Sequence, residues 1–187
     1  MIRCLALAAV LAAAALPAGA DEFTDTLESA LKAYADGDVD GARQDVDYAG
    51  KLLGSMKAQS LAKFLPDPLP GWTRAEAGEE DSTDLMGMFG GGTTTEATYT
   101  KGADDLTITL VANSPVVSSV AAMVSGLAGV ATGTKPIRIQ RTEFHNDDGE
   151  LQGVVGNKVM VSVSGSAPIE DKTAFLETMD FKALADF

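Results

Sequence analysis

Cysteine and histidine are almost absent from this chain. Its 187 residues include one cysteine, Cys4, and one histidine, His145. Cys4 lies in an N-terminal leader that we expect to be removed, so the mature chain would have no disulfide, no thiolate metal site and no cysteine nucleophile. One histidine also excludes a zinc or copper site built from several histidines of a single chain. Stability must therefore come from the burial of apolar side chains.

Positive charge is scarce as well. Fourteen Lys and Arg residues stand against 27 Asp and Glu, which gives a formal net charge of −13. Such a surface repels phosphate backbones and anionic headgroups over a Debye length of about 8 Å. We therefore expect no nucleic-acid partner. The glycine-rich stretch has no phosphate-loop lysine, and no G-x-S-x-G nucleophile elbow occurs, so the motifs indicate neither a nucleotide site nor a serine hydrolase.

What the chain does have is an apolar leader. Arg3 precedes an unbroken apolar run from Cys4 to Leu16, and Ala18–Ala20 supplies an A-x-A cleavage site before Asp21. This layout predicts a cleavable secretory signal peptide over residues 1–20, too short and wrongly flanked for a membrane span. We expect the mature protein to work in a bacterial periplasm, without stable membrane insertion after cleavage.

Residues 21–65 have the apolar spacing of two helices. Gly37 can end the first, and Asp38 is a good N-cap for the second. The apolar faces consist of Phe23, Leu27, Ala30, Leu31 and Tyr34 on the first helix and of Ala42, Val46, Ala49, Leu53 and Met56 on the second. The short connection predicts an antiparallel helical hairpin. The proline-rich segment 66–71 that follows predicts a stiff linker.

The remaining residues, 72–187, predict an α+β sandwich domain. Alternating Thr and aliphatic side chains are typical of strands, and Ser114 and Ser166 can each begin a helix. The expected strands are Trp72–Glu76, Glu96–Lys101, Leu106–Ala112, Pro136–Thr142, Leu151–Val155 and Val159–Ser164. His145 falls in the expected turn between the fourth and fifth of them. The fold class is therefore α+β: a helical hairpin, then an antiparallel sheet of five or six strands covered by two helices.

An aspartate-rich segment matches a calcium-loop pattern. Asp36, Asp38, Asp40 and Asp47 occupy positions at which alternating oxygen ligands surround Ca²⁺ in such loops. Arg43 stands where the loop normally has an aliphatic residue. The same residues also fit the solvated face of a helix, on which Arg43 and Asp47 form an i,i+4 pair. The helical interpretation is favoured, and calcium binding is the alternative.

Two further features could carry a function. Met86, Met88 and Phe89, beside three glycines, could form an adaptable partner contact, could help to hold Cu(I), or could fold onto the sheet. His145, which is followed by acidic residues, could act as a general base, although a histidine in a turn is more often only solvated.

Three segments carry a resemblance. Leu61–Thr73, Phe89–Gly102 and the helix start at Asn113–Pro115 resemble a group of short exported proteobacterial proteins. This resemblance implies export and brings no catalytic or binding residues with it. The order of elements after the linker is similar to small α+β sandwiches of the Mog1/PsbP kind, which concerns architecture and not function.

Packing residues are abundant, whereas ligand-forming and nucleophilic residues are sparse. The sequence therefore predicts a secreted periplasmic, non-enzymatic interaction module without a cofactor, with an envelope protein as its partner. The alternatives are a divalent-cation (Ca²⁺) binding protein that uses the Asp-rich loop and a periplasmic hydrolase.

Overall fold

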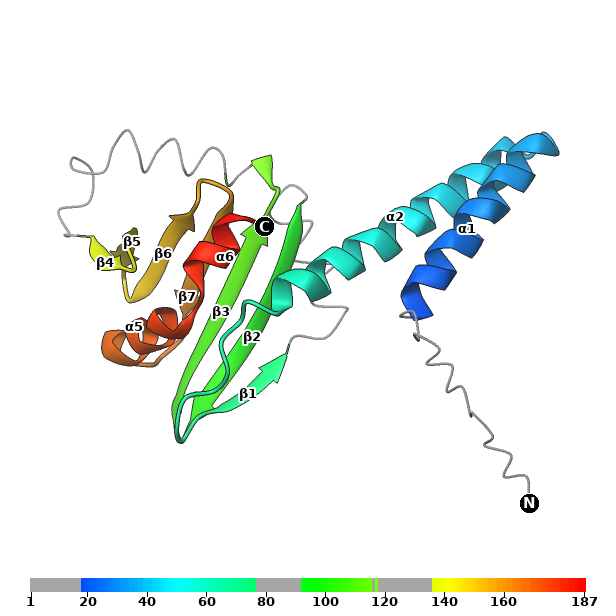
Figure 1. Ribbon diagram of the computed structural model, residues 1–187. Helices are drawn as coiled ribbons and strands as arrows, with labels where there is room; N and C mark the ends of the chain where they lie inside the picture. The colour runs from blue at the N-terminus through cyan, green and yellow to red at the C-terminus, as the bar shows by residue number, and fades with distance from the viewer. Residues whose placement is uncertain (1–17, 77–91, 116, 118–135) are drawn as a thin grey trace, which may run out of the picture. The chain divides into compact units, whose positions relative to one another are not determined.

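The computed structural model describes residues 18–76, 92–115, 117 and 136–187 (Figure 1). Two N-terminal helices precede a seven-stranded antiparallel sheet and two C-terminal helices, which confirms the predicted α+β fold class. The elements are α1 (Ala18–Ala35), α2 (Val39–Ala62), β1 (Thr73–Glu76), β2 (Thr93–Lys101), β3 (Asp104–Ala112), β4 (Ile137–Ile139), β5 (Thr142–Asp147), β6 (Glu150–Val155), β7 (Val159–Ser164), α5 (Ile169–Thr178) and α6 (Phe181–Ala185).

The chain divides into two compact units, with the boundary between Leu53 and Gly54. This boundary comes earlier than the segment 66–71 that the sequence suggests as a linker. The reason is that Leu61 and Leu65 belong to the core beneath the sheet, and the buried Tyr99 hydroxyl donates a hydrogen bond to the carbonyl of Pro66 (2.6 Å).

The turn of the hairpin is built as its sequence predicts. Gly37 adopts φ of +85°, and the N–H of Asp38 donates to the carbonyl of Ala33 (2.9 Å), which together with a bond from Gly37 to Tyr34 makes a Schellman motif. Asp38 then caps α2, because its Oδ1 accepts from the N–H of Gly41 (2.9 Å). A Cβ at position 41 would collide with the Asp38 carboxylate, so glycine leaves room for this cap.

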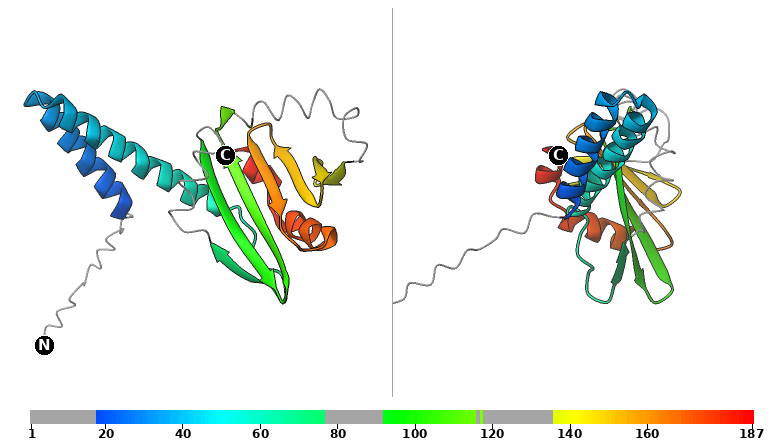
Figure 2. Two further views of the ribbon diagram at one scale, coloured as in Figure 1. Left: turned by 180° about the vertical axis from the view of Figure 1, so that it is seen from behind. Right: turned by 90° about the vertical axis from the view of Figure 1, so that its right-hand side faces the viewer.

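The strands follow the order β1-β2-β3-β7-β6-β5-β4, and every neighbouring pair is antiparallel. The apolar strands β3 and β7 lie at the centre, and the short strands β1 and β4 form the two edges. α5 and α6 lie on one face of the sheet, as the edge-on view of Figure 2 shows. The main core lies between these helices and the sheet, where strand residues such as Ile108 and Val161 meet Phe175 and Leu184.

The number of strands corrects the prediction. The segment Pro136–Thr142 is not one strand, because Gln140 and Arg141 both have positive φ (47° and 72°) and reverse the chain between β4 and β5. The sheet therefore has seven strands instead of five or six. The predicted turn around His145 is also wrong: His145 lies within β5, and the turn that follows is made by Asp148 and Gly149.

Other predicted segments fall outside the described residues. These are residues 1–17 of the predicted signal peptide and the predicted helix after Ser114 beyond Val117; Ala18–Ala20 belong to the first turn of α1. Within the described ranges, no helix combines the length and the apolar character that a bilayer span requires.

Candidate functional site: the apolar face of the hairpin

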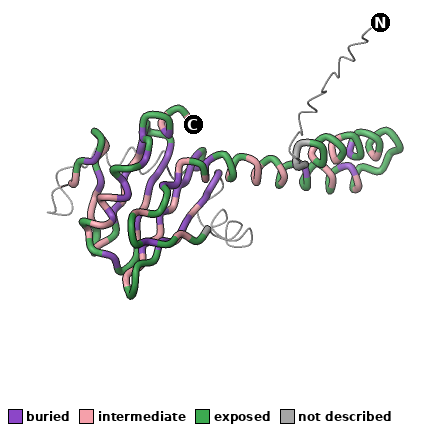
Figure 3. The backbone as a smooth tube through the Cα atoms, turned by 60° about the horizontal axis from the view of Figure 1, so that its bottom comes forward, coloured by how far each residue is buried: buried purple, intermediate pink, exposed green. Residues whose placement is uncertain are grey.

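Exposed apolar side chains gather on the helical hairpin. Among the described residues, the large apolar side chains with exposed fractions of 45% to 70% are Leu31, Tyr34, Val39, Val46, Tyr48 and Leu53. All of them belong to the first unit. The described part of the second unit buries or half-buries its large apolar side chains, and Figure 3 shows the contrast between the two regions.

Small residues explain why these side chains stay outside. The buried apolar residues of the described hairpin are Ala30, Ala42 and Ala49. An alanine has no atom beyond Cβ, so burying these three residues covers little apolar area and leaves larger neighbouring side chains outside. The two apolar faces that the sequence predicts are thus present, but their large apolar side chains are not buried between α1 and α2.

The exposed side chains form two lines. Val39, Val46 and Leu53 follow each other at intervals of seven residues along α2. Leu31 and Tyr34 follow the half-buried Leu27 along α1. At about 100° per residue, both lines are rotated from the buried alanines in the same sense, by roughly 20° to 100°. In two antiparallel helices, the same sense of rotation leads to the same side of the pair. We call these six residues the apolar face.

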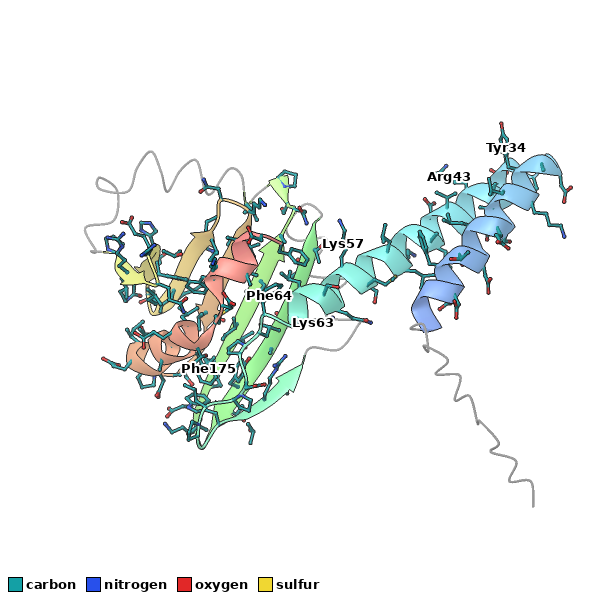
Figure 4. All side chains as sticks on the ribbon, in the orientation of Figure 1. Tyr34, Arg43, Lys57, Lys63, Phe64 and Phe175 are labelled. Atoms are coloured by element: carbon teal, nitrogen blue, oxygen red, sulfur yellow. The ribbon has the colours of Figure 1, made fainter. Side chains whose placement is uncertain are left out.

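The hairpin is rich in acidic residues. Residues Asp21–Leu53 contain nine acidic and three basic side chains. Arg43, beside this face, pairs with Asp47 at 3.8 Å, and both remain mostly exposed, so this pair adds little stability. Tyr34 and Arg43 are labelled near the closed end of the hairpin in Figure 4. The hairpin that carries the apolar face is therefore acidic overall.

On the opposite side of the hairpin, a hydrogen bond joins the two helices. The Tyr48 hydroxyl donates to Oε1 of Glu22 (2.7 Å). This hydrogen bond, followed by repulsion between the Glu22 carboxylate and a phenolate, raises the pKa of Tyr48 above its ordinary value of 10.0. Tyr48 thus joins α1 to α2 on this side, and it does not belong to the apolar face.

This bond makes the hairpin sensitive to alkali. Because the pKa of Tyr48 is raised on folding, its contribution to stability is complete below pH 10 and is lost as the pH rises through the folded-state pKa. Replacing Glu22 with Gln should bring the Tyr48 pKa back toward 10, measured by phenolate absorbance after subtraction of a Tyr48→Phe titration. Glu28→Gln, an exposed change on the same helix, should leave it unchanged. Identical titrations for the Glu22→Gln and parent proteins would contradict this assignment.

The predicted calcium ligands do not converge on a common point. Asp36 lies in the turn, Asp38 caps α2, and Asp40 and Asp47 lie on α2 itself. Within the described ranges, no group of three or more His, Cys, Asp or Glu side chains is arranged to hold a metal ion. The segment therefore has the geometry of a capped helix start with a solvated charged face.

Of the other predicted site residues, the structure describes His145 but not the three residues of the predicted partner contact. Met86, Met88 and Phe89 lie outside the described residues. His145 lies on β5 opposite Gln152, and its Nε2 is buried without a hydrogen-bond partner in the described structure.

An open cavity of about 330 Å³ lies elsewhere, where β3 ends beside the β6–β7 turn. It is lined by Asn113, Ser114, Pro115, Val117, Asn157 and Lys158. The side chains of Asn113, Ser114, Asn157 and Lys158 can form hydrogen bonds, but neither His145 nor an acidic residue lines the cavity. The geometry therefore does not join His145 to this cavity as a catalytic site.

Comparisons with protein-family models, with curated proteins and with solved structures found no match for this chain.

Sequence reasoning missed the apolar face as a site. Helical spacing identifies Leu31 and Val46 as apolar-face residues, but it does not distinguish a side chain buried between two helices from one beside the contact. The sequence does contain a signal for this face. Val39, Val46 and Leu53 alternate with Ala42 and Ala49 at the three- and four-residue intervals of a heptad pattern. The alanines of this pattern are buried, whereas its large apolar residues remain exposed.

Proposed function

We propose that this protein is a secreted, non-enzymatic interaction module that binds another protein through the apolar face of its hairpin. The observation that carries this proposal is the concentration of exposed large apolar side chains on α1 and α2. Exposed apolar patches of this kind, rimmed by polar residues, mark interaction surfaces. Full burial of an exposed Leu or Val side chain is favourable by at most about 1.5–3 kcal/mol, from which the entropic cost of association is subtracted.

The arrangement of reactive groups supports a binding role. The four aspartates of the calcium pattern are spread over a turn, an N-cap and a helix. His145 lies on a strand beside Gln152. The apolar face, by contrast, repeats along both helices of the hairpin and needs no cofactor. The predicted leader directs the protein to the periplasm, so the proposed partner is a protein of the cell envelope.

Site-specific photo-crosslinking in living cells tests this proposal. A photo-reactive amino acid at Leu31 or at Val46 should give the same discrete crosslinked product. The matched control is Gln44, which is exposed on α2 but lies away from the apolar face; it should give none. Equal products from all three positions, or products from none, would contradict the assignment of the surface.

A paired substitution provides the second measurement. Leu31→Ser together with Val46→Ser should reduce co-purification of the crosslinked partner by about ten-fold or more, since truncating two contact residues costs more than 1.4 kcal/mol. Both side chains are exposed in the free protein, so the melting temperature should change little. Met88→Ser in the same assay tests the predicted contact at Met86, Met88 and Phe89 separately.

A further inference from the structure

We propose that the partner segment bound by the apolar face is a basic amphipathic α-helix, which packs against α1 and α2 as the third helix of a bundle. This inference rests on the proposed function and specifies the chemistry of its partner. Three features of the hairpin lead to it: the spacing of the exposed side chains, their extent along the helices, and the sign of the surrounding charge.

The spacing fits another helix. Val39, Ala42, Val46, Ala49 and Leu53 follow the alternating three- and four-residue intervals of a heptad seam. A seam of this kind receives side chains of a neighbouring helix between its own residues. Leu31 and Tyr34 on α1 add further exposed apolar side chains, and the alanines beside them are buried.

The extent and the polarity of the apolar face favour a helical partner segment over an extended one. From Val39 to Leu53 the line measures about 21 Å, which corresponds to roughly four helical turns. Over this length the apolar face consists mainly of apolar side chains and has few hydrogen-bonding groups. A helix satisfies its own backbone N–H and C=O groups, whereas an extended segment would bury unpaired ones. The occupant is therefore expected to be helical.

The charge of the hairpin selects a basic helix. Nine acidic residues against three basic ones give residues 21–53 a formal charge of −6. Asp36 and Asp38 lie at the closed end, and Glu28 and Asp47 lie one residue along the chain from Leu27 and Val46. Lys or Arg residues beside the apolar stripe of an incoming helix would face these carboxylates, which speeds association and favours the correct partner. A second copy of the hairpin would bring the same negative charge and be repelled.

Two synthetic peptides of about 18 residues, roughly five helical turns, test the inference. Both have one identical leucine stripe; lysine flanks it in the first peptide and glutamate in the second. Fluorescence anisotropy with the intact protein should show at least about ten-fold tighter binding of the lysine peptide, with an affinity that falls as salt rises. The variant with Leu31→Ser and Val46→Ser should weaken this binding about ten-fold, and Gln44→Ser by less than two-fold.

Each outcome of this test supports or overturns the inference. Equal binding of the two peptides would overturn the basic character of the partner. If the variant with Leu31→Ser and Val46→Ser binds the lysine peptide as tightly as the parent protein does, the attraction is non-specific. That result would overturn the apolar face as the binding surface. A stable dimer in sedimentation equilibrium, lost in the paired variant, would show that a second copy is the occupant. If crosslinking at Leu31 and Val46 captures a partner while the lysine peptide does not bind, this inference fails and the proposed function stands.

Discussion

Replacing Phe175 with alanine is expected to destabilise the protein by about 4 kcal/mol. Phe175 lies on α5 and is completely buried. Its ring meets Trp72 edge-on at 5.3 Å and Tyr99 at 4.5 Å between ring centroids, so one side chain joins the start of β1, strand β2 and helix α5. Figure 4 labels Phe175 beside the sheet. Removing the ring would leave a cavity among residues that the sheet holds in place.

Urea unfolding followed by the fluorescence of Trp72, the single tryptophan, measures this effect. Phe175→Leu retains most of the volume and should cost less than about 1.5 kcal/mol. Glu177→Ala, an exposed change on the same helix, should stay within about 0.5 kcal/mol of the parent protein. A loss below about 1 kcal/mol for Phe175→Ala would show that α5 does not hold this core together.

Replacing Lys172 with methionine should have the second-largest effect, a loss of about 3 kcal/mol. Lys172 is only 2% exposed, although it is a lysine. Its Nζ donates to the carbonyl of Gly149 in the β5–β6 turn (2.6 Å) and to the carbonyl of Gly165 after β7 (2.7 Å). Methionine preserves the length of the side chain but donates no hydrogen bond, so both carbonyls would lose their partner.

The control for this prediction is Lys182→Met on α6, where the lysine is exposed. It should change the free energy of unfolding by no more than about 0.5 kcal/mol. Amide hydrogen exchange supplies a local readout, because Lys172→Met should speed exchange at the β5–β6 turn and at the start of α5. Equal stabilities of the two variants would mean that the buried ammonium is not required.

Local signals in the sequence were sufficient for part of the fold. Gly37 and Asp38 end one helix and start the next through contacts within a few residues, and the alternation in Leu106–Ala112 marks β3. Such features depend on backbone conformation and on burial of one face, which neighbouring residues determine. The fold class follows from these elements and their order.

The β4–β5 turn could not be predicted in this way. Gln140 and Arg141 take left-handed backbone conformations without glycine or asparagine to favour them. The Gln140 side chain donates to the carbonyls of Leu176 and Met179 at the end of α5 (3.2 and 2.8 Å). This long-range contact stabilises the turn, and the local sequence does not reveal it. The apolar face is not predictable for a related reason, since helical spacing alone does not show whether Leu31 and Val46 lie within the contact between two helices or beside it.

The order of the strands has a consequence for association of whole molecules. A sheet edge with unpaired backbone groups can add strands from other molecules and start aggregation. Here the edges are β1, with four residues, and β4, with three. The long valine- and isoleucine-containing strands, which could template a fibril, are paired on both sides. Among the described strands, the backbone segments most able to template aggregation are thereby paired within the sheet and out of reach of neighbouring molecules.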